Sequence, residues 1–491
     1  MRKLIDLEVN EQQLKKTVEV AKTRGIRIPT LDQMKNPDSV PASVKERLET
    51  TGLWDIDPVN LFRISWKNEP QERGGLYRTL PNYVEIPPEI TGVKARILAM
   101  AGKFFPTGAH KVGASFACLV PRLVTGQFDP SFHEAVWPST GNYCRGGAYT
   151  SALLGCKSIA ILPENMSKER FQWLSKVAGE VIVTPGGESN VKEIYDKTWE
   201  LRRTRNNVVI FNQFGELGNH LWHYEVTGHA MKDIVEAEVG ERGRLAGVCL
   251  TSGSAGTLGC ADFLKEQYPN ARLAVGEAIQ CPTLLNNGFG SHRIEGIGDK
   301  HVPWIHNVKN TDMVIGIDDG DSLGMFRLLN EPEGRRYLKG IGISGDVAEK
   351  LSWVGISGAA NIACCIKFAK YYELTERDMV LTVLTDSAEM YQSRLEEMEE
   401  ERGRKYALTD AALDHAVSVS GLRTDFVEEL TYYGKKRIHN LKYYTWIEQQ
   451  GYDPDELDAQ WYDYDGYWGR LHRMAPELDR LIVQFNEMVD R

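Results

Sequence analysis

A lysine within a turn is the first residue of this sequence that suggests covalent chemistry. In Lys103-Phe-Phe-Pro-Thr-Gly-Ala-His110-Lys111, residues 106–108 should form a turn, and a helix should begin near Lys111. A lysine at a helix N-terminus lies against the positive end of the helix dipole, which lowers the pKa of the amine and favours its use as a nucleophile. Schiff-base formation is one such use. An isolated lysine of this kind is more often an ordinary surface residue.

Two loops rich in glycine and hydroxyl side chains offer binding sites for anions. Residues 139–142, Ser-Thr-Gly-Asn, lie between the run EAVWP and an expected helix. Their backbone N–H groups suit a substrate carboxylate, and Asn142 can hydrogen-bond a phenolic oxygen. Residues 253–257, Gly-Ser-Ala-Gly-Thr, follow the run GVCL, and their two glycines allow close approach to a phosphate. Each loop alone also fits a helix cap or a tight turn.

Two further segments place a hydroxyl after an apolar run. Ser357 opens the expected helix NIACCIKFAKYY, and Thr385 and Ser387 follow the run MVLTV. Any of the three hydroxyls can face a buried heteroatom. Taken singly, such residues are more often caps or turns.

The elements that must position these residues alternate between strand and helix. The runs ARILAM, SIAILPE, EVIVTP, NVVIFN, GVCLTS, RLAVGEA, DMVIGID and MVLTVLT predict buried strands, and segments such as KEIYDKTWELRR and CADFLKEQ predict helices between them. This order predicts an α/β fold with mainly parallel sheet, whose ligands bind at the carboxyl ends of the strands. We expect a helical N-terminal extension over 1–65, a catalytic core over 66–400 with a smaller mobile subdomain at about 105–230, and a helical, aromatic-rich extension over 401–491.

Composition excludes several other classes of protein. The 491 residues include 58 Lys and Arg against 68 Asp and Glu, so the formal charge of −10 argues against nucleic-acid binding. No apolar run is long enough to span a membrane, and the N-terminus lacks the apolar core of a signal peptide. The eight cysteines contain no C-x-x-C pair, which favours reduced, buried thiols and a cytoplasmic protein.

Taken in order, these segments resemble the cysteine synthase and cystathionine β-synthase family, of the fold type II pyridoxal-phosphate enzymes. Residues 139–142 look like that family's asparagine loop, and residues 253–257 look like its phosphate loop. Residues 219–228 are similar to the segment before its central helix. Residues 291–298, Ser-His-Arg-Ile-Glu-Gly-Ile-Gly, are similar to its glycine-rich strip beside the cofactor. The resemblance covers about residues 80–395 and implies two open, twisted, mainly parallel sheets with the cofactor between two domains.

The resemblance also implies roles for individual residues. Lys111 would hold pyridoxal 5′-phosphate as an internal aldimine and then act as acid and base at Cα. Asn142 would bond the cofactor's O3′, and the asparagine loop would bind the substrate carboxylate. Ser357 would face the pyridine nitrogen, with Ser387 or Thr385 as alternatives. The residues of the asparagine loop implied to bind the substrate carboxylate are Ser139, Thr140, Gly141 and Asn142. The remaining residues implied to bind the cofactor are His110, Gly253, Ser254, Ala255, Gly256 and Thr257, and Gly296 and Gly298 would lie near it.

The implied activity is β-elimination or β-replacement on a small amino acid. The β-substituent would leave to give an aminoacrylate, and a nucleophile would add to it or water would hydrolyse it. The sequence departs from the family at three places. Thr-Gly-Ala-His-Lys111 looks like the tryptophan synthase β subunit, whose catalytic glutamate would fall near Ser139. Ser254 and Ala255 replace the usual Thr and Gly, and the extensions lie outside the resemblance.

These departures leave alternatives open. A homodimer is expected, but the chain also fits the catalytic β subunit of a two-subunit enzyme, such as 2-amino-4-oxopentanoate thiolase, with the aromatic tail docking the partner. A serine or threonine dehydratase and an inactive cofactor-binding protein are further alternatives. We expect no metal site, because His220, His223 and His229 fit polar or interface positions better than a ligand set.

Overall fold

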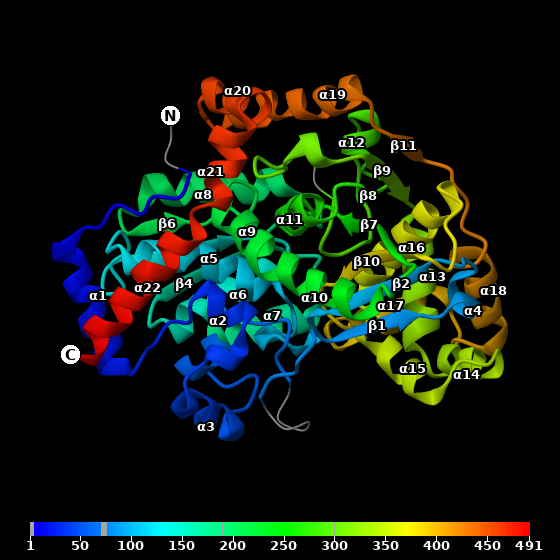
Figure 1. Cartoon of the computed structure of the whole chain (residues 1–491), viewed down its shortest axis with the longest axis horizontal. Helices are drawn as coiled ribbons and strands as arrows, with labels where there is room; N and C mark the ends of the chain where they lie inside the picture. The colour runs from blue at the N-terminus through cyan, green and yellow to red at the C-terminus, as the bar shows by residue number, and fades with distance from the viewer. Residues whose placement is uncertain (1–3, 70–75, 189, 299) are drawn as a thin grey trace.

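The computed structural model describes residues 4–69, 76–188, 190–298 and 300–491. Two sheets form its centre, and helices cover them (Figure 1). The sheets are composed of separate parts of the chain, since strands β3–β6 form one sheet and all other strands form the second. The predicted α/β class with two mainly parallel sheets is confirmed.

The larger sheet has seven strands in the order β1-β2-β10-β7-β8-β9-β11. Its five central strands are parallel to their neighbours, whereas the edge strands β1 and β11 are antiparallel. The central strands are almost entirely buried, which explains their continuous apolar sequences. The bounds are β1 Tyr83–Ile86, β2 Arg96–Ala101, β7 Arg244–Thr251, β8 Arg272–Ala278, β9 Met313–Ile317, β10 Asp378–Leu384 and β11 Val427–Glu429.

The smaller sheet has four parallel strands in the order β5-β4-β3-β6. Their bounds are β3 Glu134–Pro138, β4 Lys157–Pro163, β5 Glu180–Thr184 and β6 Val208–Ile210. All eight strands predicted from apolar runs are present in the two sheets. The central positions belong to β3 and β4, whose side chains are mostly buried.

Helices of the core connect the strands and begin close to the segments with candidate chemistry. Helix α5 begins at Lys111, as predicted, directly after a 3₁₀ turn at Pro106–Gly108. Helix α16 is buried along most of its length and packs on β7, β8, β9 and β10. The core helices are α4 Pro88–Thr91, α5 Lys111–Val124, α6 Asn142–Leu153, α7 Lys168–Val177, α8 Val191–Thr204, α9 Leu217–Trp222, α10 Gly228–Glu238, α11 Gly259–Gln267, α12 Thr283–Asn286, α13 Asp319–Asn330, α14 Pro332–Gly340, α15 Gly345–Lys350, α16 Ile356–Tyr371 and α17 Gln392–Arg402.

The two terminal segments pack on the core and on each other. Helices α1 and α22 lie side by side in Figure 1, at the blue and red ends of the chain. Asn10 caps α1 by accepting a hydrogen bond from the Gln13 N–H, and Gly25, in the left-handed region at φ 62°, ends it. The helices are α1 Glu11–Arg24, α2 Leu31–Lys35, α3 Ala42–Thr50, α18 Leu408–Ser418, α19 Tyr432–Lys442, α20 Pro454–Tyr462, α21 Arg470–His472 and α22 Ala475–Asp490.

The C-terminal segment is not entirely helical, which corrects the expectation from sequence. Strand β11 pairs with β9 and covers that edge of the larger sheet, with Val427 opposite Ile315. Without β11, the backbone N–H and C=O groups along this edge of β9 would be unpaired, and pairing with β11 supplies their hydrogen-bond partners. The segment therefore completes the core as well as covering it.

Within the described residues, no single helix is both long and apolar enough to cross a membrane. One bent pair, Gly345–Trp353 with Ile356–Tyr371, meets that test of length and composition together.

Candidate active site

Four of the candidate segments follow the carboxyl ends of strands, and the fold brings them to one narrow cavity. Lys111 follows β2, the asparagine loop follows β3, the phosphate loop follows β7 and Thr385 follows β10. Of the predicted residues, those that line the cavity are Lys111, Ser139, Thr140, Asn142, Gly253, Ser254, Gly296 and Thr385. The cavity lies where parallel α/β sheets generally bind ligands.

Lys111 and the phosphate loop are in direct contact. The Lys111 Nζ atom donates a hydrogen bond to Ser254 Oγ at 2.9 Å, and Asn219 Nδ2 donates to the same oxygen at 3.1 Å. Ala255 adopts the left-handed region at φ 64°, where a non-glycine residue is strained by about 1–3 kcal/mol. At Gly256, a Cβ atom would lie 2.0 Å from Asn219 Oδ1, so only glycine fits.

The asparagine loop is held by a buried aspartate. Asn142 Nδ2 donates to Asp386 Oδ2 at 2.7 Å, and the Tyr391 hydroxyl donates to the same oxygen at 2.6 Å. Burial raises the pKa of the Asp386 carboxyl. The Gly141 N–H donates to Ser139 Oγ at 3.1 Å, which fixes the turn at the start of α6. Asn142 Oδ1 is buried and has no hydrogen-bond partner among the described residues.

The three candidate hydroxyls for the pyridine nitrogen differ in their surroundings. Ser357 Oγ is buried and without a hydrogen-bond partner in the described part of the chain, and it lies 3.7 Å from the position of a Cβ at Gly296. Thr385 lines the cavity itself. Ser387 is buried but is not among the lining residues, and it precedes the 3₁₀ turn Ala388–Met390.

Several predicted residues lie outside the cavity lining. His110 is fully buried, and its ring packs against Trp66 and His223 at centroid distances of 5.4 and 5.1 Å. The N–H of Gly298 donates to the Ser252 carbonyl at 2.9 Å, which joins the glycine-rich strip to the strand before the phosphate loop. The other predicted residues outside the lining are Ser357, Ser387 and four residues of the two loops, namely Gly141, Ala255, Gly256 and Thr257.

The cavity is also lined by residues that were not predicted individually, namely Tyr143, Glu188, Gln213, Phe214 and, within the glycine-rich strip, Ile297. Glu188 is the acid among them, and its side chain is buried. The Thr140 hydroxyl donates to Glu188 Oε1, and burial raises the pKa of this carboxyl to about 8. The available signal was the position of Gly186-Gly187-Glu188 directly after a predicted strand.

A buried arginine joins the two halves of the site. Arg170, on α7 beside the smaller sheet, lies 2.7 Å from Glu295 Oε2 of the glycine-rich strip. It also donates to the Thr140 carbonyl and to the Tyr391 hydroxyl, both at 2.9 Å. The Arg170 and Glu295 side chains are 0% and 4% exposed, so solvent screens this pair little.

Of the three histidines considered for a metal, only His220 belongs to a cluster of possible ligands within the described part of the chain, together with Asp262 and His472. Its Nε2 atom lies 3.2 Å from Nε2 of His472 and 3.6 Å from Asp262 Oδ2. The two rings are nearly coplanar, with an angle of 4° and a centroid distance of 5.4 Å. They therefore meet end to end, as in an N–H···N hydrogen bond, and this contact joins α21 to α9.

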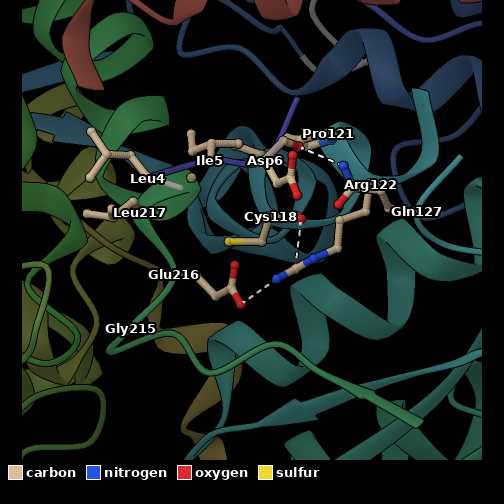
Figure 2. Close-up of a pocket in the computed structure, with 12 residues that line it drawn as sticks. Leu4, Ile5, Asp6, Cys118, Pro121, Arg122, Gln127, Gly215, Glu216 and Leu217 are labelled. Atoms are coloured by element: carbon tan, nitrogen blue, oxygen red, sulfur yellow. Dashed lines mark hydrogen bonds and ion pairs between the residues drawn. The ribbon is translucent and has the colours of Figure 1, made fainter. Parts of the chain in front are cut away.

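A second pocket, of about 270 Å³, is separate from this site (Figure 2). It lies between Leu4–Asp6 at the N-terminal end, the second half of α5 and the loop before α9. Arg122 forms an ion pair with Glu216 across it at 3.0 Å. It shares no residue with the lining of the cavity around Lys111.

The residues around Lys111 fit a phosphate-bearing pyridine aldehyde. A buried amide oxygen at Asn142 and a buried hydroxyl at Ser357 both lack partners in the described structure, as expected of atoms that bind a polar ligand. In the phosphate loop, a Cβ at Gly253 would lie 2.7 Å from the Gly296 carbonyl oxygen, so the glycines keep this wall of the site clear of side chains. The lysine amine beside the loop supplies the nucleophile for the aldehyde.

Known proteins agree with this interpretation. The chain is 29% identical over 291 residues to a probable cysteine synthase of Bacillus subtilis, covering 59% of this chain and 86% of the relative. It is 27% identical over 312 residues to cystathionine beta-synthase of Saccharomyces cerevisiae, covering 62% and 58%. The solved structure of an O-acetylserine dependent cystathionine beta-synthase from Helicobacter pylori matches with a TM-score of 0.54 and 25% identity, over 64% of this chain and 95% of that chain.

The family model described as "Pyridoxal-phosphate dependent enzyme" matches residues 83–386, which include Lys111, both loops and the glycine-rich strip. It ends before the aromatic C-terminal segment. The chain therefore belongs to the pyridoxal-phosphate dependent enzyme family and uses pyridoxal 5′-phosphate as its cofactor.

Proposed function

We propose that the chain catalyses β-replacement on an amino acid, with β-elimination as the partial reaction when no nucleophile is present. The observation that carries this proposal is the direct contact between Lys111 and the phosphate loop, in a cavity that the asparagine loop also lines. The relatives named cysteine synthase and cystathionine beta-synthase support the same reaction class.

Each group of residues in the site has a separate role in this proposal. When bound, pyridoxal phosphate supplies the electron sink that acidifies the Cα–H bond of an amino acid. The Lys111 amine holds the cofactor and then moves the Cα proton. The asparagine loop binds the substrate carboxylate, and the phosphate loop anchors the cofactor. Ser357 takes the position at the pyridine nitrogen, because its hydroxyl is the buried one without a partner in the described chain.

The experiment that tests this function mixes cofactor-loaded protein with a panel of amino acids that carry different β-substituents. We expect at least one donor to change the visible absorbance and to release pyruvate and ammonia. Adding a thiol or sulfide should divert the same donor into a β-substituted amino acid. Transamination without loss of the β-substituent, or no reaction with any donor, would contradict the proposal.

We also propose that the enzyme works as a homodimer. Exposed aromatic side chains gather near α19, where Tyr433 is 81% exposed and Phe289 is 76% exposed. Arg437 on α19 donates to Asn287 Oδ1 at 2.8 Å, which places the two segments side by side. A patch of this kind marks an interface.

Light scattering should give twice the chain mass, and Tyr433→Lys with Phe289→Ser should give a monomer. A monomeric wild type that needs another chain for activity would favour a two-subunit enzyme instead.

A further inference from the structure

Glu188 is shared by the linings of two separate hollows in the structure. It lines the narrow cavity together with Lys111, and it also lines a cleft of about 410 Å³. That cleft is bordered by Glu295, by Arg394 on α17, and by residues of the segment between β5 and α8. The Glu188 carboxyl is therefore the one lining group that the cleft and the cavity have in common among the described residues.

The surroundings of Glu188 favour a neutral carboxylic acid. Burial raises the pKa of its carboxyl to about 8. Arg170 is the cation that acts to lower this pKa, but its guanidinium is already paired with Glu295 and bonded to the Thr140 carbonyl and the Tyr391 hydroxyl. Glu188 therefore lacks an ion pair of its own and holds a proton at neutral pH.

The hydrogen bonds of Glu188 indicate which oxygen carries this proton. Oε1 accepts a hydrogen bond from the Thr140 hydroxyl. Oε2 is buried and has no partner with hydrogen-bond geometry among the residues that the structure describes, although the Gly296 N–H faces the carboxyl and acts to lower its pKa. The proton on Oε2 is thus available to a heteroatom of a bound ligand, while Thr140 ties the acid to the loop that binds the substrate carboxylate.

We propose that Glu188 is the general acid that protonates the leaving group on the substrate's β-carbon, and that the substrate therefore carries a β-hydroxyl or β-thiol. This inference rests on the proposed function. Hydroxide or hydrosulfide leaves less readily as an anion than chloride or a carboxylate does, so a proton on the departing atom assists the first two leaving groups. A general acid at this position therefore accelerates the reaction only of substrates that carry a β-hydroxyl or β-thiol.

The step balances as one proton transfer. The Cβ–X bond breaks and its electron pair leaves with X, while the pair left at Cα after removal of its proton forms the Cα–Cβ double bond. The proton of Glu188 Oε2 moves to X, so that water departs from a β-hydroxyl substrate or hydrogen sulfide from a β-thiol substrate, and Glu188 becomes a carboxylate. In β-replacement, the incoming nucleophile H–Nu forms the Cβ–Nu bond and returns its proton to Glu188. In β-elimination, solvent returns the proton.

The test compares two donors that give the same products but differ in leaving group. L-Serine needs a proton on its β-oxygen, and β-chloro-L-alanine does not, yet both yield pyruvate and ammonia. Glu188→Gln keeps the size of the side chain and the acceptor for Thr140 but has no acidic proton. We expect kcat/KM for serine to fall by about 10²-fold or more, and that for β-chloroalanine to change by less than about 3-fold.

Glu164→Gln is the matched control, because Glu164 is an exposed acid that accepts a hydrogen bond from Gly186 in the same segment. It should leave both donors unaffected. The wild type gives a second measurement that needs no variant. Turnover of serine relative to β-chloroalanine should fall as the pH rises through about 8, since the active form is the protonated one. Other charged residues surround Glu188, namely Lys111, Arg170 and Glu295. A change in their charge affects the turnover of both donors, so the ratio of the two turnovers reports on the protonation of Glu188.

Each outcome decides between the claims. Equal losses for both donors in Glu188→Gln, or no loss for either, would overturn the role of Glu188 and leave the proposed function intact. If the turnover of serine relative to β-chloroalanine did not change with pH, the role of Glu188 would also be overturned and the proposed function would stand. A wild-type enzyme that releases pyruvate from neither donor nor from any other member of the panel would overturn the proposed function, and this inference with it.

Discussion

Lys111→Ala should abolish turnover and the visible absorbance of the bound cofactor. Without the amine there is no covalent attachment of the cofactor and no base for the Cα proton. Positioned acid–base catalysis alone contributes about 10²–10⁴-fold, so we expect a loss of at least that size in kcat/KM. Pyruvate release from the best donor and the absorbance spectrum of the cofactor-loaded variant measure the two effects separately.

The matched control is Lys103→Ala in the same segment. Lys103 is partly exposed and pairs with Glu389, away from the lining of the cavity. This variant should keep the spectrum and most of the activity. If Lys111→Ala retained the wild-type spectrum and turnover, another lysine would hold the cofactor and the assignment of the site would be wrong.

Arg170→Met is expected to have the largest effect on stability. The arginine is fully buried, and its loss leaves the Glu295 carboxylate, the Thr140 carbonyl and the Tyr391 hydroxyl without their shared partner. Breaking a buried ion pair from one side typically costs about 3–5 kcal/mol. We expect the midpoint of urea unfolding to fall accordingly. Activity should fall too, since Thr140 belongs to the asparagine loop.

Arg203→Met on α8 is the control for this change. Arg203 is exposed, and surface substitutions of this kind usually alter stability by less than about 0.5 kcal/mol. The double variant Arg170→Met with Glu295→Gln should recover part of the loss, because the buried carboxylate, which would keep only Arg394 of its two arginine partners, becomes a neutral amide. An Arg170→Met protein as stable as the wild type would show that the pair does not hold the two halves of the site together.

The parts of the structure that the sequence predicted correctly depend on local patterns. The apolar runs that became β2, β4 and β8 are buried on both faces, so their composition alone identified them. The segment Thr-Gly-Ala-His-Lys111 predicted a turn followed by the start of a helix, and the structure contains both. Two of the strands without a prediction, β1 and β11, have four and three residues, which is too short for a recognisable pattern.

The parts of the structure that the sequence did not predict depend on contacts between distant segments. Arg170, Glu188 and Asp386 are charged residue types, which a sequence alone places on the surface. They are buried because the strand ends of both sheets converge there and supply partners such as Thr140 and Tyr391. The position of His110 was also unpredictable, since the N-terminal segment supplies the Trp66 ring that packs against it.

The most direct test of this account is borohydride reduction of the cofactor-loaded wild-type protein, followed by peptide mass spectrometry. Reduction makes a covalent link between cofactor and lysine permanent. We expect one modified peptide, with the pyridoxyl group on Lys111. Recovery of the label on a different lysine, or of unmodified Lys111 from protein that shows the cofactor's absorbance, would contradict the account.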